Sequence, residues 1–510
     1  MDRRMSWSLR RVCGVSVVLA TLAAGCATEM TVGDGAADGR SNDTGGVRDV
    51  IPIDTGPRDG SDTDGAVVPV TDQVDFLLMV DNSNSMQQNQ AQIMAQLGAL
   101  IAGLTNPPCV SRTNTTPHAC SATDPTDRPL FPAVRDMHVG VISSDLGTAG
   151  IVVNGCANPS GGDEGLLNPI HFGPALAMHR PTPGSPTAAP AGFRPPECMD
   201  PAQFPAFISF RSGTTSPATF DRDFRCNAGL YVNGCGLEQP LEAVRRALIE
   251  HDARERAGNT DPNAGFVRDG AVLAIVLLTD EEDMSVRDCT HAGGSPCTDA
   301  RGVFDVASSA WSSPVLNLRA YLYRAGSAQD PTWPLERYVN PRDANAGWLS
   351  LKPGHPERIV FAAITGVPLR LSTTDRGVTD WDALLGPAGA DRDDYNARNA
   401  LGAVSEMSRE GLVSMRQPNL DPRCSDRAVP ACRREGQLDD PMRPACVNTE
   451  QYFAWPARRI VEVARRFDQS NLCSGTPCNN GMVCSICASS FSACVLNLAE
   501  RVGRRLLPPG

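Results

Sequence analysis

The sequence has few of the residues that a nucleic-acid-binding surface needs. Lys352 is the only lysine among 510 residues, and the formal net charge is −12 at pH 7. A chain with this excess of carboxylates repels phosphate backbones, so we expect no nucleic-acid partner. The seven histidines are dispersed without the spacing of metal ligands.

Common enzyme motifs are absent as well. The sequence contains no Gly-x-Ser-x-Gly elbow, no His-Glu-x-x-His motif and no glycine-rich phosphate loop. We therefore expect a protein that is not an enzyme. A hydrolase site assembled from distant residues stays open as an alternative, without a motif to favour it. After residue 25, no run approaches the ~18 apolar residues that a membrane-spanning helix needs.

Residues 1–25 are typical of a secretory signal peptide. Four arginines precede an apolar run over residues 12–22, which ends in the small residues Ala23-Ala24-Gly25-Cys26. This ending resembles a bacterial lipoprotein signal, which implies cleavage before Cys26 and lipidation of its sulfur. The lipid would then be the only membrane anchor. Ala27 stands where an aspartate would favour the inner membrane, so we expect the outer membrane, on either face. An ordinary secreted protein is the alternative.

The 18 cysteines favour an oxidising compartment. Sixteen remain, an even number, when Cys13 of the signal and Cys26 are set aside. Several form close pairs in polar, proline-rich stretches that bury little apolar surface, so we expect disulfides to close these stretches. The close pairs are Cys109 with Cys120, Cys289 with Cys297, and Cys473 with Cys478.

Cys484 and Cys487 have the Cys-x-x-Cys spacing of zinc sites. No second pair and no histidine cluster accompanies them. We therefore expect both to form disulfides, although the sequence does not reveal the partners.

The chain divides into a tether and one long domain. Residues 26–71 are rich in Gly, Asp and Thr and have few large apolar residues, which predicts a flexible acidic tether. A calcium-binding repeat is the alternative, but no fixed period is present. Residues 72–507 are expected to form the domain. Its insertions, at about 105–135, 156–222 and 368–450, are rich in Pro, Gly and Cys.

Strand-like and helix-like stretches alternate along this domain. Such alternation predicts an α/β fold with a doubly wound, mostly parallel sheet covered by helices on both faces. We expect strands over 74–80, 137–143, 271–278, 358–364 and 482–486, and helices over 87–104, 239–251, 455–467 and 488–506.

Two expected strands end in runs of oxygen-bearing residues. DNSNS (residues 81–85) follows the first, and TDEED (residues 279–283) follows a later one. Because ligands of open parallel sheets bind beyond the carboxyl ends of the strands, these runs are expected to converge. Carboxylates and hydroxyls without a soft ligand suit Mg²⁺ or Ca²⁺. The plainer alternative is that DNSNS makes only a turn and a helix cap.

In this context, DNSNS and TDEED resemble the metal-ion-dependent adhesion site of von Willebrand factor A-type (VWFA) domains. That site combines Asp-x-Ser-x-Ser after the first strand with an aspartate after the fourth. The resemblance implies a Rossmann-like core in which Asp81, Ser83, Ser85 and Asp280 bind the metal, the two serines directly.

The resemblance covers residues 72 to about 315, 355–366 and 451–507. The stretches GCGLEQPLEAVRRAL, LLTDEEDMS and PERIVFAAITGVP are also similar to long, cysteine-containing bacterial lipoproteins that carry this domain.

The sequence departs from the family at one ligand. Where VWFA domains supply a threonine from a loop before a helix, this chain has Glu238. Glu238 as a ligand would strengthen cation binding and make the metal less electrophilic toward an acidic partner residue. Glu281, Asp283 and Asp145 are possible accessory groups. An acidic loop exposed to solvent explains Glu281 and Asp283 slightly better, and a plain turn explains Asp145 equally well.

These features together predict a lipid-anchored envelope protein. The resemblance implies that it binds a protein or another macromolecule through the divalent cation, with the metal accepting a carboxylate of the partner. The insertions would form the rim of the site and set its specificity. The alternative is an envelope scaffold in which the metal only stabilises the fold.

Overall fold

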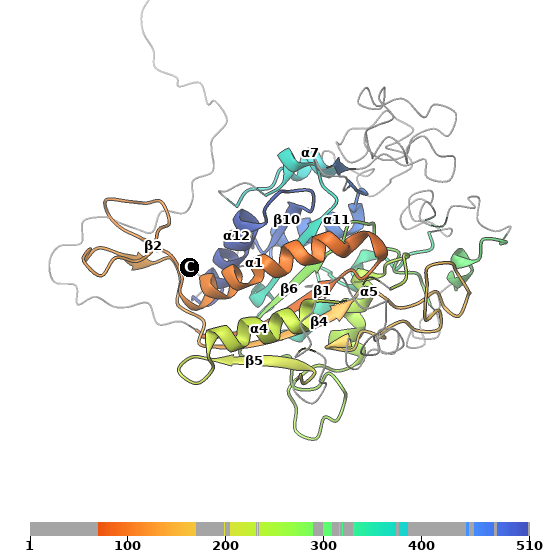
Figure 1. Ribbon diagram of the computed structural model, residues 1–510, viewed down its shortest axis with the longest axis horizontal. Helices are drawn as coiled ribbons and strands as arrows, with labels where there is room; N and C mark the ends of the chain where they lie inside the picture. Colours follow the sequence, from red (N-terminus) through yellow and green to blue (C-terminus); the bar gives the residue numbers. More distant parts are fainter. Residues whose placement is uncertain are drawn as a thin grey trace, which may run out of the picture. The chain divides into compact units, whose positions relative to one another are not determined.

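A six-stranded sheet forms the centre of the computed structural model (Figure 1). The strand order is β10-β7-β6-β1-β4-β5. All neighbouring pairs are parallel except β4 and β5, which are antiparallel. The predicted mostly parallel α/β sheet is therefore confirmed. The strands are β1 (Gln73–Val80), β4 (Asp136–Ser143), β5 (Phe207–Arg211), β6 (Val272–Leu278), β7 (Ile359–Thr365) and β10 (Gly481–Ser485).

The structure describes residues 70–169, 198, 204–230, 232, 234–288, 299–308, 316, 319, 330–373, 377–385, 445–447, 453–473 and 477–507. All of them belong to one compact unit. The expected signal peptide, Cys26, nearly all of the tether, and the pair Cys289 and Cys297 lie outside these residues, as do large parts of the later insertions.

Helices cover both faces of the sheet, because the central strands are apolar on both sides. Every residue of β6 and β7 is buried, as expected for strands between two helical layers. On β1, Phe76 and Leu78 belong to one hydrophobic cluster, whereas Leu77 and Met79 belong to another on the opposite face.

Three helices lie side by side on the Phe76 face (Figure 1). They are α1 (Gln87–Thr105), α4 (Pro217–Ala228) and α12 (Ser492–Arg504). The other cluster packs under α5 (Pro240–Arg245), the π-helix η4 (Arg246–Glu250), α7 (Trp381–Leu385) and α11 (Arg458–Asp468).

Short elements complete the described chain. The strands are β2 (Cys109–Val110), β3 (Arg128–Pro129), β8 (Cys446–Val447) and β9 (Phe453–Ala454). The 3-10 helices are η1 (Asn84–Met86), η6 (Arg301–Phe304), η8 (Leu335–Arg337), η9 (Trp348–Leu351), η10 (Pro356–Arg358) and η11 (Leu369–Leu371).

The five predicted strands are present, each within one residue of its expected bounds. The helix expected over 455–467 begins only at Arg458, since the Trp455 N–H instead donates to the Asp280 carbonyl at 2.7 Å. Strand β5 and helix α4 were not predicted, and both lie at or near the end of the segment expected to be an insertion at 156–222. Phe220 and Phe224 of α4 are nonetheless buried in the core.

Six disulfides join cysteines among the described residues: Cys109–Cys120, Cys156–Cys235, Cys198–Cys226, Cys446–Cys487, Cys473–Cys478 and Cys484–Cys494. Cys484 and Cys487 thus both form disulfides, as expected, and the two disulfides are different ones. Within the described ranges, no helix is long and apolar enough to cross a membrane.

Candidate cation site at the carboxyl edge of the sheet

The two predicted runs meet at the carboxyl edge because β1 and β6 are parallel neighbours. Val80 lies opposite Leu278 in the sheet, so Asp81 and Asp280 leave adjacent strands at nearly the same level. The hydroxyl of Ser85 donates to a carboxylate oxygen of Asp280 at 3.1 Å, and the Ser83 and Ser85 hydroxyl oxygens are 3.0 Å apart. Asp81, Ser83, Ser85 and Asp280 are therefore brought together.

Asp81 is buried and fixed by hydrogen bonds. The Thr279 hydroxyl donates to Asp81 Oδ2 at 2.7 Å, and the Ser83 N–H donates to Oδ1 at 2.8 Å. The Gln90 side chain donates to the Asp81 carbonyl at 2.8 Å. Burial raises the pKa of Asp81, and the bonds from Thr279 and Ser83 only partly oppose this shift.

Glu238 reaches the same edge from the segment that precedes α5. It is 1% exposed, and both carboxylate oxygens are buried without a hydrogen-bond partner. Burial raises its pKa well above the ordinary value, and the charges of Glu281, Asp81 and Asp280 raise it further. A buried carboxyl group without a partner is costly. Within the described part of the chain, neither carboxylate oxygen of Glu238 thus has a hydrogen-bond donor to offset its burial.

The donor set fits a hard cation. Five residues offer oxygen atoms, and Ser85 is exposed while Ser83 and Glu238 are buried. The site thus has one side toward solvent. The carboxylate oxygens of Asp81, Glu238 and Asp280 do not all lie within 4.8 Å of one another, so a cation held by these groups needs bridging water or a small closing movement.

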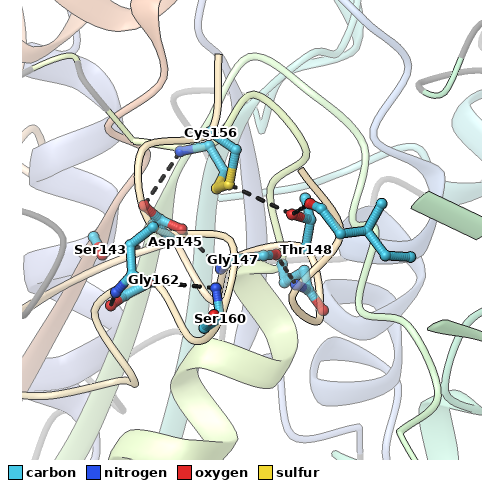
Figure 2. Close-up of a disulfide and its surroundings, with 11 residues drawn as sticks. Ser143, Asp145, Gly147, Thr148, Cys156, Ser160 and Gly162 are labelled. Carbon is cyan, nitrogen blue, oxygen red and sulfur yellow. Dashed lines mark hydrogen bonds between the residues drawn. A yellow bond between two sulfur atoms is a disulfide. The ribbon is translucent and has the colours of Figure 1, made fainter. Parts of the chain in front are cut away.

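One other group of potential ligands stands close by. Atoms of Asp145, Cys156 and Cys235 lie within 4.8 Å of one another (Figure 2). The two sulfurs form a disulfide, so they offer no thiolate to a soft metal. Asp145 accepts the N–H groups of Gly147 at 2.8 Å and Cys235 at 3.2 Å. Burial raises the pKa of Asp145 to about 6, and Asp81 contributes to the shift.

The predicted accessory residues have different surroundings. Asp283 is fully buried and accepts from the Leu241 N–H at 3.1 Å and from Arg459 Nε at 2.9 Å, so its carboxylate serves a helix start and an ion pair. Glu281 is half-buried and close enough to raise the pKa of Glu238. It is therefore the better placed of the two to act on a cation.

Two further buried side chains lie at this edge, Thr279 and Asn82, and the sequence predicted no role for either. Thr279 fixes Asp81. Asn82 is fully buried with both amide atoms lacking a partner, and a Cβ at Gly234 would lie 2.2 Å from its Oδ1. Asn82 lies in the DNSNS run and Thr279 in the TDEED run. Only the side chains around them in the folded protein distinguish them from ordinary turn residues.

A cleft of about 430 Å³ opens next to the segment that carries Glu238 and precedes α5. Gln239, the next residue, lines it together with Leu146, Glu242, Arg246, Arg301 and Trp333. The edge of the sheet thus combines oxygen donors with a neighbouring polar cleft.

No family model and no curated protein matches this chain, and no solved structure matches it.

Proposed function

We propose that the protein binds a divalent cation through Asp81, Ser83, Ser85, Glu238 and Asp280. The observation that carries the proposal is the Glu238 carboxyl group, which is buried without a partner beside Asp81, Asp280 and Glu281. A cation would supply the missing partner and allow all of these groups to ionise. The same oxygen-only donor set argues against a soft metal.

We propose Ca²⁺ as the preferred ion. Ca²⁺ takes six to eight oxygen ligands in flexible geometry, whereas Mg²⁺ keeps most of its waters and binds through one or two carboxylates. Asp81, Glu238 and Asp280 offer three carboxylates, and Ser83 and Ser85 add two hydroxyls.

At the level of the whole protein, we propose a VWFA-type core in an exported, lipid-anchored envelope protein. Three features support this proposal: the mostly parallel sheet with helices on both faces, Asp-x-Ser-x-Ser directly after β1, and Thr-Asp directly after β6. Exposed Ser85 gives the cation a side from which a partner's carboxylate can approach. The neighbouring cleft would then hold other groups of this macromolecular partner.

The alternative is a structural cation in an envelope scaffold. Glu238 favours this alternative, because a carboxylate supplied from within can fill the position that a partner would otherwise occupy. The two functions differ in whether the bound ion keeps an exchangeable position.

Calorimetric titration of Ca²⁺ and Mg²⁺ into chelator-stripped residues 72–510 tests cation binding. We expect saturable binding to the wild type and none to the Asp81→Ala, Ser83→Ala double variant. Glu255→Gln, which removes an exposed carboxylate elsewhere, should bind like the wild type. Equal heats from all three proteins would refute the site.

Water-proton relaxation of the Mn²⁺-loaded protein then separates the two functions. If the ion keeps an open position, acetate will displace a bound water and lower the relaxation enhancement in a saturable way. If Glu238 closes the position, acetate will have no effect on the wild type but will act on Glu238→Ala. The second result would favour the structural scaffold.

A further inference from the structure

The segment that carries Glu238 is held along its whole length by backbone hydrogen bonds. The Gly234 N–H donates to the Asn82 carbonyl at 2.9 Å, and the Gln239 N–H donates to the Ser144 carbonyl at 3.1 Å. The carbonyl of Glu238 itself accepts from the Met284 N–H at 2.8 Å. Backbone hydrogen bonds thus attach the segment around Glu238 to the loops that follow β1, β4 and β6.

Cys235 adds a covalent attachment to this segment. Its disulfide with Cys156 joins it to the loop after β4, and its N–H donates to Asp145 in the same loop. Figure 2 shows Asp145 and the disulfide next to each other, with the Thr148 hydroxyl donating to Cys156 Sγ at 3.7 Å. Only Gly236 and Leu237 separate this attachment from Glu238.

The Asp145 loop is itself closely packed, so it is a firm support. Asp145 Oδ1 accepts the Gly147 N–H at 2.8 Å. Gly162 has a φ of +59°, and a Cβ there would lie 2.4 Å from Asp145 Oδ1. A larger residue at position 162 would therefore displace the Asp145 loop.

We propose that the Cys156–Cys235 disulfide and Asp145 form a clamp that positions Glu238 and thereby determines the Ca²⁺ preference of the cation site. This inference rests on the proposed function. Asp145, Cys156 and Cys235 are positioning residues, since they act on the ion through Glu238.

The clamp is needed because both burial and the neighbouring negative charges disfavour the buried position of the Glu238 carboxylate. Its carboxylate gives up hydration on burial, and Asp81, Asp280 and Glu281 repel it. In a segment free to move, the side chain would turn toward water whenever the ion left. Holding the carboxylate in place lowers the cost of assembling the ligands at the moment of binding. Ca²⁺ gains more from this third carboxylate than Mg²⁺ does.

Opening the disulfide by Cys156→Ser, Cys235→Ser tests the clamp. We expect the Ca²⁺ affinity to fall by about 10- to 100-fold, the range known for groups that orient metal ligands, and the Mg²⁺ affinity to change much less. The matched control is Cys109→Ser, Cys120→Ser, which opens a disulfide in the loop between α1 and β4. Its Ca²⁺ affinity should equal that of the wild type.

A double-mutant cycle with Glu238→Gln separates positioning from a general structural role. In the Glu238→Gln background, opening the clamp should have little further effect on Ca²⁺ affinity. An equal loss in both backgrounds would overturn the clamp while leaving the cation site intact. The absence of saturable binding to the wild type would instead refute the proposed function itself.

Urea unfolding of each variant shows whether the protein without the Cys156–Cys235 disulfide is still folded. If Cys156→Ser, Cys235→Ser does not fold, Asp145→Asn provides the same test without breaking a covalent bond, because an amide nitrogen cannot accept the Cys235 N–H. A Ca²⁺ affinity unchanged in Asp145→Asn would then contradict the inference, and a selective loss of Ca²⁺ over Mg²⁺ would support it.

Discussion

Glu238 is the residue on which stability and the proposed function make opposite demands. Its carboxyl group is buried without a hydrogen-bond partner among the described residues, which costs stability. In the proposed cation-bound protein the same group is a ligand. A residue that weakens the empty protein and strengthens the loaded one is typical of a binding site and difficult to explain by packing alone.

This opposition predicts two effects of opposite sign for Glu238→Gln. In the presence of a chelator, the variant should be more stable than the wild type by about 1–3 kcal/mol, because its amide is neutral and is not repelled by Asp81, Asp280 and Glu281. With Ca²⁺ at 100 times the wild-type Kd, the wild type should gain about 2.7 kcal/mol and the variant clearly less. Urea unfolding with and without Ca²⁺ measures both. A variant less stable than the wild type under chelation would contradict the account.

At the residue scale, the local sequence predicted that the motif residues among the proposed ligands meet at one edge of the sheet. Asp81, Ser83, Ser85 and Asp280 follow strands that apolar residues identify, so their convergence could be expected. The clamp could not be predicted, because the pairing of Cys156 with Cys235 depends on how two distant loops fold. The same holds for Asp145, whose N–H donors lie two and 90 residues away.

At the scale of the elements, strand β10 packs against helix α11 at a glycine. A Cβ at Gly481 would lie 1.7 Å from the Ala464 carbonyl oxygen, whereas one at Gly103 in α1 would meet the Ala499 Cβ at an ordinary 3.6 Å. Gly481→Ala should therefore destabilise the protein by about 1–3 kcal/mol or more. Gly103→Ala should stabilise it by up to about 1 kcal/mol through helix propensity.

Thermal or urea unfolding of the two variants checks this contrast. Equal effects of the same sign would show that the contact between α11 and β10 is looser than the structure describes. Far-ultraviolet circular dichroism serves as the control for an intact fold.

Strand β4 carries a histidine that predicts a pH dependence. Burial lowers the pKa of His138 below 6.5, and Arg268 adds to the shift against the opposing charges of Asp75 and Asp136. The unfolded chain therefore binds a proton more readily, so the stability due to His138 is complete above about pH 6.5 and is lost as the pH falls below it.

A comparison of the wild type with His138→Phe isolates the contribution of His138 to the pH dependence of the unfolding free energy. The ring at 138 packs against Phe207 at 4.6 Å between centroids, and phenylalanine preserves that contact. Between pH 7.5 and 5.5 the wild type should lose more unfolding free energy than the variant, by at most about 1.4 kcal/mol per pH unit. Parallel pH profiles for the two proteins would show that His138 titrates alike in both states.

Element prediction succeeded where apolar runs were long and failed where local signals were short. β6 and β7 are continuous apolar runs, and their bounds were predicted to within one residue. β5 has five residues in an alternating pattern, inside a stretch that is rich in Pro and Gly. Helix α4 did carry a local signal, since Ser216 caps it and Pro217 begins it.

At the scale of the whole molecule, the only lysine reports on global unfolding. Lys352 is 1% exposed and lies 3.5 Å from Asp75 Oδ2, with its ammonium group also donating to the Arg268 carbonyl. Burial lowers its pKa. An amine-reactive ester should therefore leave Lys352 unmodified in the native protein and acylate it along the urea unfolding curve, as followed by peptide mass spectrometry. Rapid acylation without urea would contradict this burial.

The central claim concerns the whole carboxyl edge of the sheet, namely that Glu238 and the DNSNS run hold one divalent cation. Anomalous X-ray diffraction from crystals soaked in Mn²⁺ tests it most directly, because the ion can be located independently of the protein atoms. We predict a single strong peak among Ser83, Ser85 and Glu238, lost in Asp81→Ala, Ser83→Ala crystals. No peak at this edge, or one that leaves the Glu238 carboxylate uncoordinated, would contradict it.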